Sequence, residues 1–94
     1  MDIAKSNIVK ASAGRDRGKL FYVLCVEGEY LLLADGKGRR VEAPKRKKRR
    51  HVQFVSAEQT RLSDKIRSDE KITNSELRRA LASFRETSNL DQEG

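Results

Sequence analysis

Hydrophobic positions along this chain are concentrated in its first 55 residues, in short runs separated by glycine-containing or charged turns. Residues 19–26 (KLFYVLCV) form the longest run, rich in aromatic and β-branched side chains, and predict a strand that is buried on both faces. Residues 8–12 (IVKAS) and 30–34 (YLLLA) predict shorter strands. Residues 39–42 (RRVE) and 51–55 (HVQFV) alternate in polarity and predict a fourth and a fifth strand.

Turn-forming residues separate these strands. Asp35-Gly36 predicts a tight hairpin, because glycine accepts positive φ without steric cost, and Pro44 ends the ladder of the fourth strand. Five short strands joined by tight turns within about 50 residues predict a small antiparallel five-stranded barrel, since closure removes exposed sheet edges.

The apolar spacing becomes helical after Val55. Leu62 and Ile66 lie four residues apart and predict a short helix. Residues 73–76 (TNSE) match a capping box at the start of a second helix. That helix carries an apolar stripe, suited to packing against the strands, at Leu77, Ala80, Leu81 and Phe84.

The predicted organisation is mostly β with an α extension and no second full domain. Residues 6–55 form the barrel, and residues 56–86 form a helical C-terminal extension that packs on it. Residues 87–94 are polar and are expected to be a disordered tail.

Charge is distributed unevenly along the chain. Of the net charge of +7, residues 1–55 contribute +8 (14 basic and 6 acidic side chains) and residues 56–94 contribute −1 (7 and 8). The excess indicates a polyanionic partner of the first part, with nucleic acid favoured over an anionic membrane. The chain contains no apolar run of membrane-spanning length and no signal-peptide pattern, and its single cysteine fits a reducing compartment, so we expect a cytoplasmic protein.

Three basic segments are the candidate binding elements. The first lies between two glycines that let a phosphate approach the backbone, the second is the 35–40 hairpin, and the third is a run of six cations after Pro44. Alternate connections of a meander lie at one end of a sheet, so the first two should be neighbours, and the run should extend their potential as a stripe along one side. The candidate residues are Gly14, Arg15, Arg17, Gly18, Lys19, Lys37, Arg39, Arg40, Lys45, Arg46, Lys47, Lys48, Arg49 and Arg50.

Structural interpretations of these segments remain open. The first two loops also fit ordinary charged hairpin turns, and the cationic run also fits a solvated charge run or a nuclear-localisation-like segment. The acidic turn with Glu27 and Glu29 should lie beside the cationic run and neutralise part of it. Most aromatic residues are expected in the core, with Tyr30, beside a turn, as the exception that suits base stacking.

The sequence contains no pattern that predicts catalysis. It has no Ser/His/Asp set and no carboxylate pair, and Cys25 lies within a strand expected to be buried. His51 has no second ligand at metal-binding spacing, so neither a metal nor a cofactor is expected.

Residues 8–45 resemble a KOW motif, with an apolar strand, a Gly14-x-x-x-Gly18-Lys19 turn, a long apolar strand and a return hairpin. The phrases ASAGRDRGK, LADGKGRRVEAPKRKK and KITNSELRRAL are similar to the short bacterial KOW-domain RNA-binding proteins, relatives of KOW-bearing large-subunit ribosomal proteins of archaea and eukaryotes. This resemblance, over roughly residues 6–85, implies an SH3-like barrel that binds RNA, with structured ribosomal RNA as the target. The site residues that it implies are the turn residues Gly14, Arg15, Arg17, Gly18 and Lys19, whereas the other candidates rest on charge and placement.

Two hypotheses therefore follow from the sequence. The first is a non-enzymatic RNA-binding protein of the ribosome, monomeric away from its target. The alternative is a protein-interaction module, like the KOW domain of NusG-type factors, that binds an acidic partner in transcription or translation.

Overall fold

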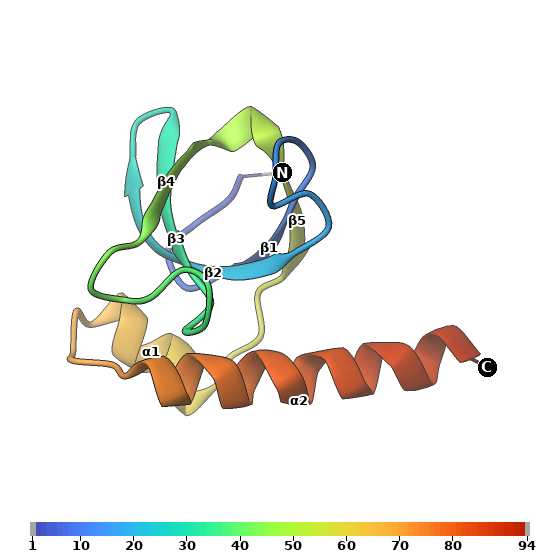
Figure 1. Cartoon of the computed structure of the whole chain (residues 1–94). Helices are drawn as coiled ribbons and strands as arrows, with labels where there is room; N and C mark the ends of the chain where they lie inside the picture. The colour runs from blue at the N-terminus through green and yellow to red at the C-terminus, as the bar shows by residue number, and fades with distance from the viewer. Residues whose placement is uncertain (1, 94) are drawn as a thin grey trace.

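The structure is a computed structural model that describes the backbone of residues 2–93 and the side chains of residues 2–87. Five strands precede two α-helices, as Figure 1 shows. In chain order the elements are β1 (Ile8–Ala11), β2 (Leu20–Glu27), β3 (Tyr30–Ala34), β4 (Lys45–Lys48), the 3-10 helix η1 (Arg49–His51), β5 (Val52–Ser56), α1 (Arg61–Arg67) and α2 (Asn74–Glu93).

All five strands belong to one antiparallel sheet in the order β4-β3-β2-β1-β5, which confirms the mostly β class with two helices after the strands. The sheet is strongly curved in Figure 1, but it is not closed. Its edge strands β4 and β5 are connected by η1, and within residues 2–93 no ladder joins them.

The predicted fourth strand is wrong. Residues 39–42 lie in the loop between β3 and β4, where Ala43 N donates to Arg40 O and closes a turn. The backbone N–H of Val41 donates to the side chain of Asn74 at 2.8 Å, so a ladder partner cannot use it. The strand that pairs with β3 is instead β4, the first four residues of the cationic run. A short edge strand made of lysine and arginine resists pairing with another sheet.

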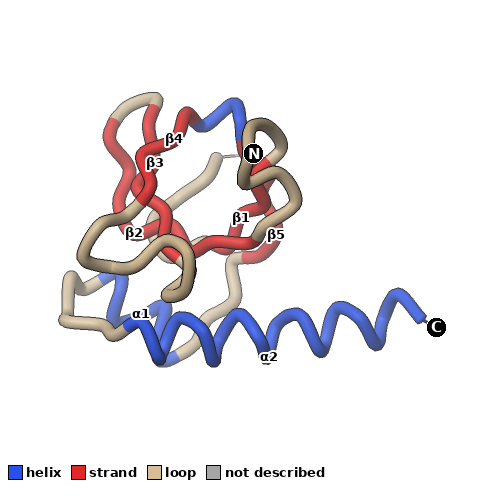
Figure 2. The backbone as a smooth tube through the Cα atoms, viewed as in Figure 1, coloured by secondary structure: helices blue, strands red, loops and turns tan. Residues whose placement is uncertain are grey.

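Both sides of the sheet bury apolar side chains. The inner side holds a cluster that includes Val9, Phe21, Val23, Leu31 and Leu33. The helix-facing side packs Ile8, Leu20, Tyr22 and Ala34 against Leu62 and Ile66 of α1 and Leu77 and Leu81 of α2. Residues 20–24 of β2 contribute alternately to the two clusters, as the apolar run predicts. The end of the run departs from the prediction, since Cys25 is half-buried and Val26 is exposed. Figure 2 shows both helices on one side of the sheet, with α2 extending beyond it.

Capping residues define where the helices begin. Thr60 caps α1 through reciprocal bonds with Ser63. In the capping box predicted for the second helix, Thr73 N donates to Glu76 Oε1 at 2.9 Å and Glu76 N donates to Thr73 Oγ1 at 3.1 Å. The helix α2 continues to Glu93 and so includes most of the segment 87–94 that the sequence predicts to be disordered, while Gly94 lies outside the described residues.

Neither helix is long and apolar enough to cross a membrane, as judged over the part of the chain that the structure describes.

Candidate nucleic-acid interface

A buried carboxylate joins the two basic loops. Asp16, only 7% exposed, accepts a hydrogen bond from Arg39 Nη2 at 3.3 Å and lies 3.7 Å from Lys19 Nζ. The loop of residues 12–19 and the loop of residues 35–44 therefore meet at one end of the sheet, as the meander predicts. We call this surface the loop end.

The strand β4 also contacts the loop end. Lys47 Nζ donates to the carbonyl oxygen of Ala13 at 2.8 Å, and a Cβ atom at Gly14 would lie 3.3 Å from the same ammonium. Gly14 and Gly18 both have positive φ, +81° and +88°, in the conformation that glycine favours. One cation of the run thus serves to hold the 12–19 loop.

Pairing with β3 divides the cationic run between the two sides of the sheet. Lys45 and Lys47 pair with Leu33 and Leu31, whose side chains belong to the inner cluster. Arg46 and Lys48 pair with Leu32 and Tyr30, so they point to the opposite side, because paired residues share a face. The predicted continuous stripe along one side is therefore wrong, since successive residues of a strand alternate between faces.

The acidic turn between β2 and β3 lies at the other end of the sheet, beside the cationic run, as expected. Arg46 Nε lies 3.6 Å from Glu27 Oε1, and the backbone N–H of Arg49 donates to Glu29 O at 2.8 Å. Arg49 Nη2 donates to the carbonyl oxygen of Ile3 at 2.5 Å, which makes this arginine a tie to the N-terminal segment. We call this surface the turn end.

Partners within the chain separate the predicted site residues into two groups. Those with side-chain hydrogen bonds or ion pairs are Lys19, Arg39, Arg40, Arg46, Lys47 and Arg49. Those whose side chains make no such contact among residues 2–87 are Arg15, Arg17, Lys37, Lys45, Lys48 and Arg50. The three exposed members of the second group at the loop end, Arg15, Arg17 and Lys37, are the cations there that are free to meet a ligand.

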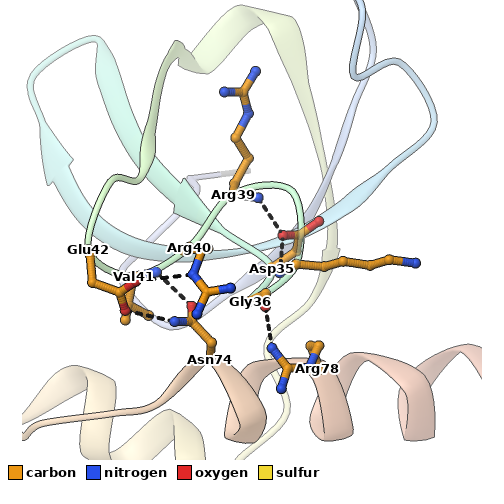
Figure 3. A network of polar contacts seen from close by, with 9 residues as sticks. Asp35, Gly36, Arg39, Arg40, Val41, Glu42, Asn74 and Arg78 are labelled. Carbon is orange, nitrogen blue, oxygen red and sulfur yellow. Dashed lines mark hydrogen bonds and ion pairs between the residues drawn. The ribbon is translucent and has the colours of Figure 1, made fainter.

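The loop of residues 35–44 is held by its own carboxylate and by the start of α2 (Figure 3). Asp35 Oδ1 accepts from the backbone N–H groups of Lys37 and Arg39, both at 2.9 Å. Asn74 Nδ2 donates to Glu42 Oε1 at 2.7 Å, and Arg78 Nη1 donates to Gly36 O at 2.6 Å.

Sequence reasoning missed Asn74 and Arg78 as residues that position this loop. Asn74 lies within the capping box and Arg78 lies four residues later, so both would be expected on the first turns of one helix. No local pattern indicates that this helix end meets a loop more than 30 residues away, because that contact depends on how α2 packs on the sheet.

Two carboxylates near the start of α2 have lowered pKa values. The pKa of Glu42 is lowered chiefly by the hydrogen bond from Asn74 and then by that from Arg40. The pKa of Glu76 is lowered chiefly by Lys65, whose Nζ lies 2.8 Å from Glu76 Oε2, and then by the backbone of Thr73. Both groups therefore favour the charged form in the folded protein.

Acidification is expected to weaken the start of α2. Because the folded pKa values of Glu42 and Glu76 lie below their ordinary value of 4.5, their contribution to stability is complete above that pH. It is lost as the pH falls through the lowered folded values. Urea midpoints measured from about pH 6 to about pH 3 should fall with acid, and the fall should be shallower for the Glu42→Gln/Glu76→Gln variant. Equal acid dependence of the two proteins would contradict this assignment.

Among the aromatic residues, core positions and the exception of Tyr30 occur as predicted. Phe21 and Tyr22 are buried, and burial raises the pKa of the Tyr22 hydroxyl to about 12, with a smaller effect of Glu58. Tyr30 is half-buried at the turn end, where the Arg46 guanidinium carbon lies 3.8 Å from its ring centroid. Cys25, expected within a buried strand, is a half-buried free thiol because it lies where β2 extends beyond the core clusters. No group of three metal-ligating side chains occurs within the described residues.

Comparisons with known proteins gave no match, either to a protein-family model or to a curated protein.

Proposed function

We propose that this protein is a non-enzymatic RNA-binding protein that acts on the ribosome or on ribosomal RNA, and that its curved sheet is an SH3-like barrel of the KOW type. The observation that carries the proposal is the contact of Asp16 with Arg39, which brings two basic loops together. The choice of RNA among polyanions rests on the resemblance of three sequence phrases to KOW-domain proteins. The five antiparallel strands and the positive φ of Gly14 and Gly18 are consistent with it.

Binding would begin with the phosphates of the RNA backbone. Arg15, Arg17 and Lys37 are exposed on loops whose backbones are fixed by internal contacts, so little backbone order is lost when their side chains pair with phosphate oxygens. Phosphate contacts release condensed counterions, which makes the affinity depend on salt. If about six phosphates are engaged, raising salt from about 50 to 200 mM lowers the affinity on the order of a thousandfold.

Replacing Arg15, Arg17 and Lys37 together by alanine is expected to weaken binding of structured RNA on the order of a hundredfold at about 0.15 M salt. The slope of log K against log salt should decrease by about three, roughly one for each lost phosphate contact. Fluorescence anisotropy with a labelled ribosomal RNA hairpin over a salt series measures both quantities.

A matched control variant replaces Arg61, Lys71 and Arg85 by alanine. These three cations are also exposed and lie in the helical part of the chain. Their replacement removes the same amount of positive charge as the loop variant does. If both variants lose affinity equally, only net charge matters and the loop end is not the site. If neither variant changes RNA binding but the loop variant loses capture of an acidic protein partner, the chain is a protein-interaction module instead.

A further inference from the structure

Tyr30 and Arg46 form a cation–π pair at the turn end, away from the loop end. Tyr30 begins β3 and Arg46 lies on the neighbouring strand β4, with their side chains on the same face of the sheet. The guanidinium carbon lies 3.8 Å from the ring centroid, which is a close cation–π contact. The Arg46 side chain nevertheless remains 59% exposed.

Glu27 also restrains the Arg46 side chain. It pairs with Tyr30 across β2 and β3 and lies 3.6 Å from Arg46 Nε. The guanidinium is thus restrained by the ring that its carbon lies over and by a carboxylate near its Nε. Since most of the side chain is exposed, a planar group can reach the guanidinium from the solvent side. A restrained arginine loses less side-chain entropy when it stacks on a ligand.

A cationic hollow adjoins the pair. Its volume is about 250 Å³, and its lining consists of Glu29, Lys48, Arg49 and Arg50. Lys48 belongs to both features, because its Nζ lies 6.0 Å from the Tyr30 centroid. Residues two apart on a strand face, such as Arg46 and Lys48, are about 6.6 Å apart along the strand. The hollow carries three cations against one carboxylate, which favours an anion.

We propose that the turn end binds one unpaired nucleotide of RNA, with its base stacked on the exposed face of the Arg46 guanidinium and its phosphate in the hollow beside Lys48 and Arg50. Tyr30 supports the guanidinium from the other side. This inference rests on the proposed RNA-binding function and adds to it a class of target, an RNA with a looped-out or single-stranded base. A base within a duplex has both faces covered by its neighbours and cannot stack in this way.

The test uses the full chain and a short single-stranded RNA that carries 2-aminopurine at its centre, whose fluorescence falls when the base stacks. An RNA of the same length with an abasic central nucleotide keeps every phosphate. The wild-type protein should quench 2-aminopurine and should bind the abasic RNA roughly 5- to 150-fold more weakly, the range expected for one stacked base.

Arg46→Lys keeps the charge and removes the planar group, so it should lose the quenching and the preference for the base. Tyr30→Phe keeps the ring and should retain both, whereas Tyr30→Leu should lose both. Urea unfolding of each variant checks that the sheet is intact. Should Arg46→Lys be unfolded, the abasic comparison repeated with Tyr30→Leu decides whether the preference for the base depends on this pair.

Equal affinity of the wild type for the base-containing and abasic RNAs would overturn the inference, as would quenching that survives in a folded Arg46→Lys variant. The loop-end variant with Arg15, Arg17 and Lys37 replaced separates this failure from failure of the proposed function. If that variant loses binding of the hairpin RNA while the turn-end variants behave as wild type, RNA binding stands and the stacking site does not exist.

Discussion

Replacing Gly36 by alanine is expected to lower the free energy of unfolding by about 2–5 kcal/mol. Gly36 has φ +79°, where a side chain costs about 1–2 kcal/mol. A Cβ atom there would also lie 2.2 Å from the carbonyl oxygen of Asn74 and 3.1 Å from Leu77 Cβ. The first contact is with backbone, so either the 35–44 loop or the start of α2 has to move.

Gly18→Ala is the matched control. Gly18 also has positive φ, +88°, but a Cβ atom there would have no neighbour within 4 Å. Its substitution should cost only the conformational term, about 1–2 kcal/mol. Urea unfolding followed by circular dichroism gives both values, and the difference between them is the cost of separating the loop from the helix.

The Gly36 variant should also lose contacts that position the loop end. Movement of α2 would lengthen the bond from Asn74 to Glu42 and the bond from Arg78 to Gly36. A Gly36 variant as stable as the Gly18 variant would contradict the close approach of the loop to the start of α2.

Replacing Leu77 by alanine is expected to destabilise the whole fold by about 2–5 kcal/mol, the usual cost of deleting a buried leucine. Leu77 is fully buried between α2 and the helix-facing side of the sheet, in one cluster with Tyr22 and Ala34. Removing its side chain leaves a cavity at the contact that joins the helices to the strands. A domain of this size has a total stability of roughly 5–15 kcal/mol, so the loss is a large part of it.

The number of unfolding transitions distinguishes a core shared by sheet and helices from helices that fold independently. Because the helices cover one of the two apolar faces of β2, sheet and helices should unfold in a single transition, and Leu77→Ala should shift the whole of it. Val26→Ala is the control, since Val26 is 36% exposed and its truncation should cost well under half as much. Two separate transitions, with only the helical signal shifted by Leu77→Ala, would contradict the shared core.

Local patterns predicted the parts of the fold that depend on local interactions. The apolar run of β2 predicted burial on both faces, and residues 20–24 divide between the two clusters, while Val26 at the end of the run is exposed. The reciprocal bonds of Thr73 and Glu76 require only residues three apart, so their spacing was sufficient.

The position of the fourth strand could not be predicted in the same way. Residues 39–42 alternate as a strand should, whereas Lys45–Lys48 carries no hydrophobic period at all. The Asn74 side chain accepts a hydrogen bond from the N–H of Val41, so residues 39–42 do not pair with β3. The basic residues of β4 pair with β3 instead. A run of like charges contains no information on which residues face the core.

The sequence by itself determined four of the five strands, the two helices, and the position of two glycine-containing basic loops in the chain. Only the tertiary structure decided which cations are available to a ligand. Asp16 and Ala13 O engage Arg39 and Lys47, while Arg15, Arg17 and Lys37 remain exposed. The physical reason is that these partners lie more than 20 residues away, so their contacts form only when strand register brings the segments together.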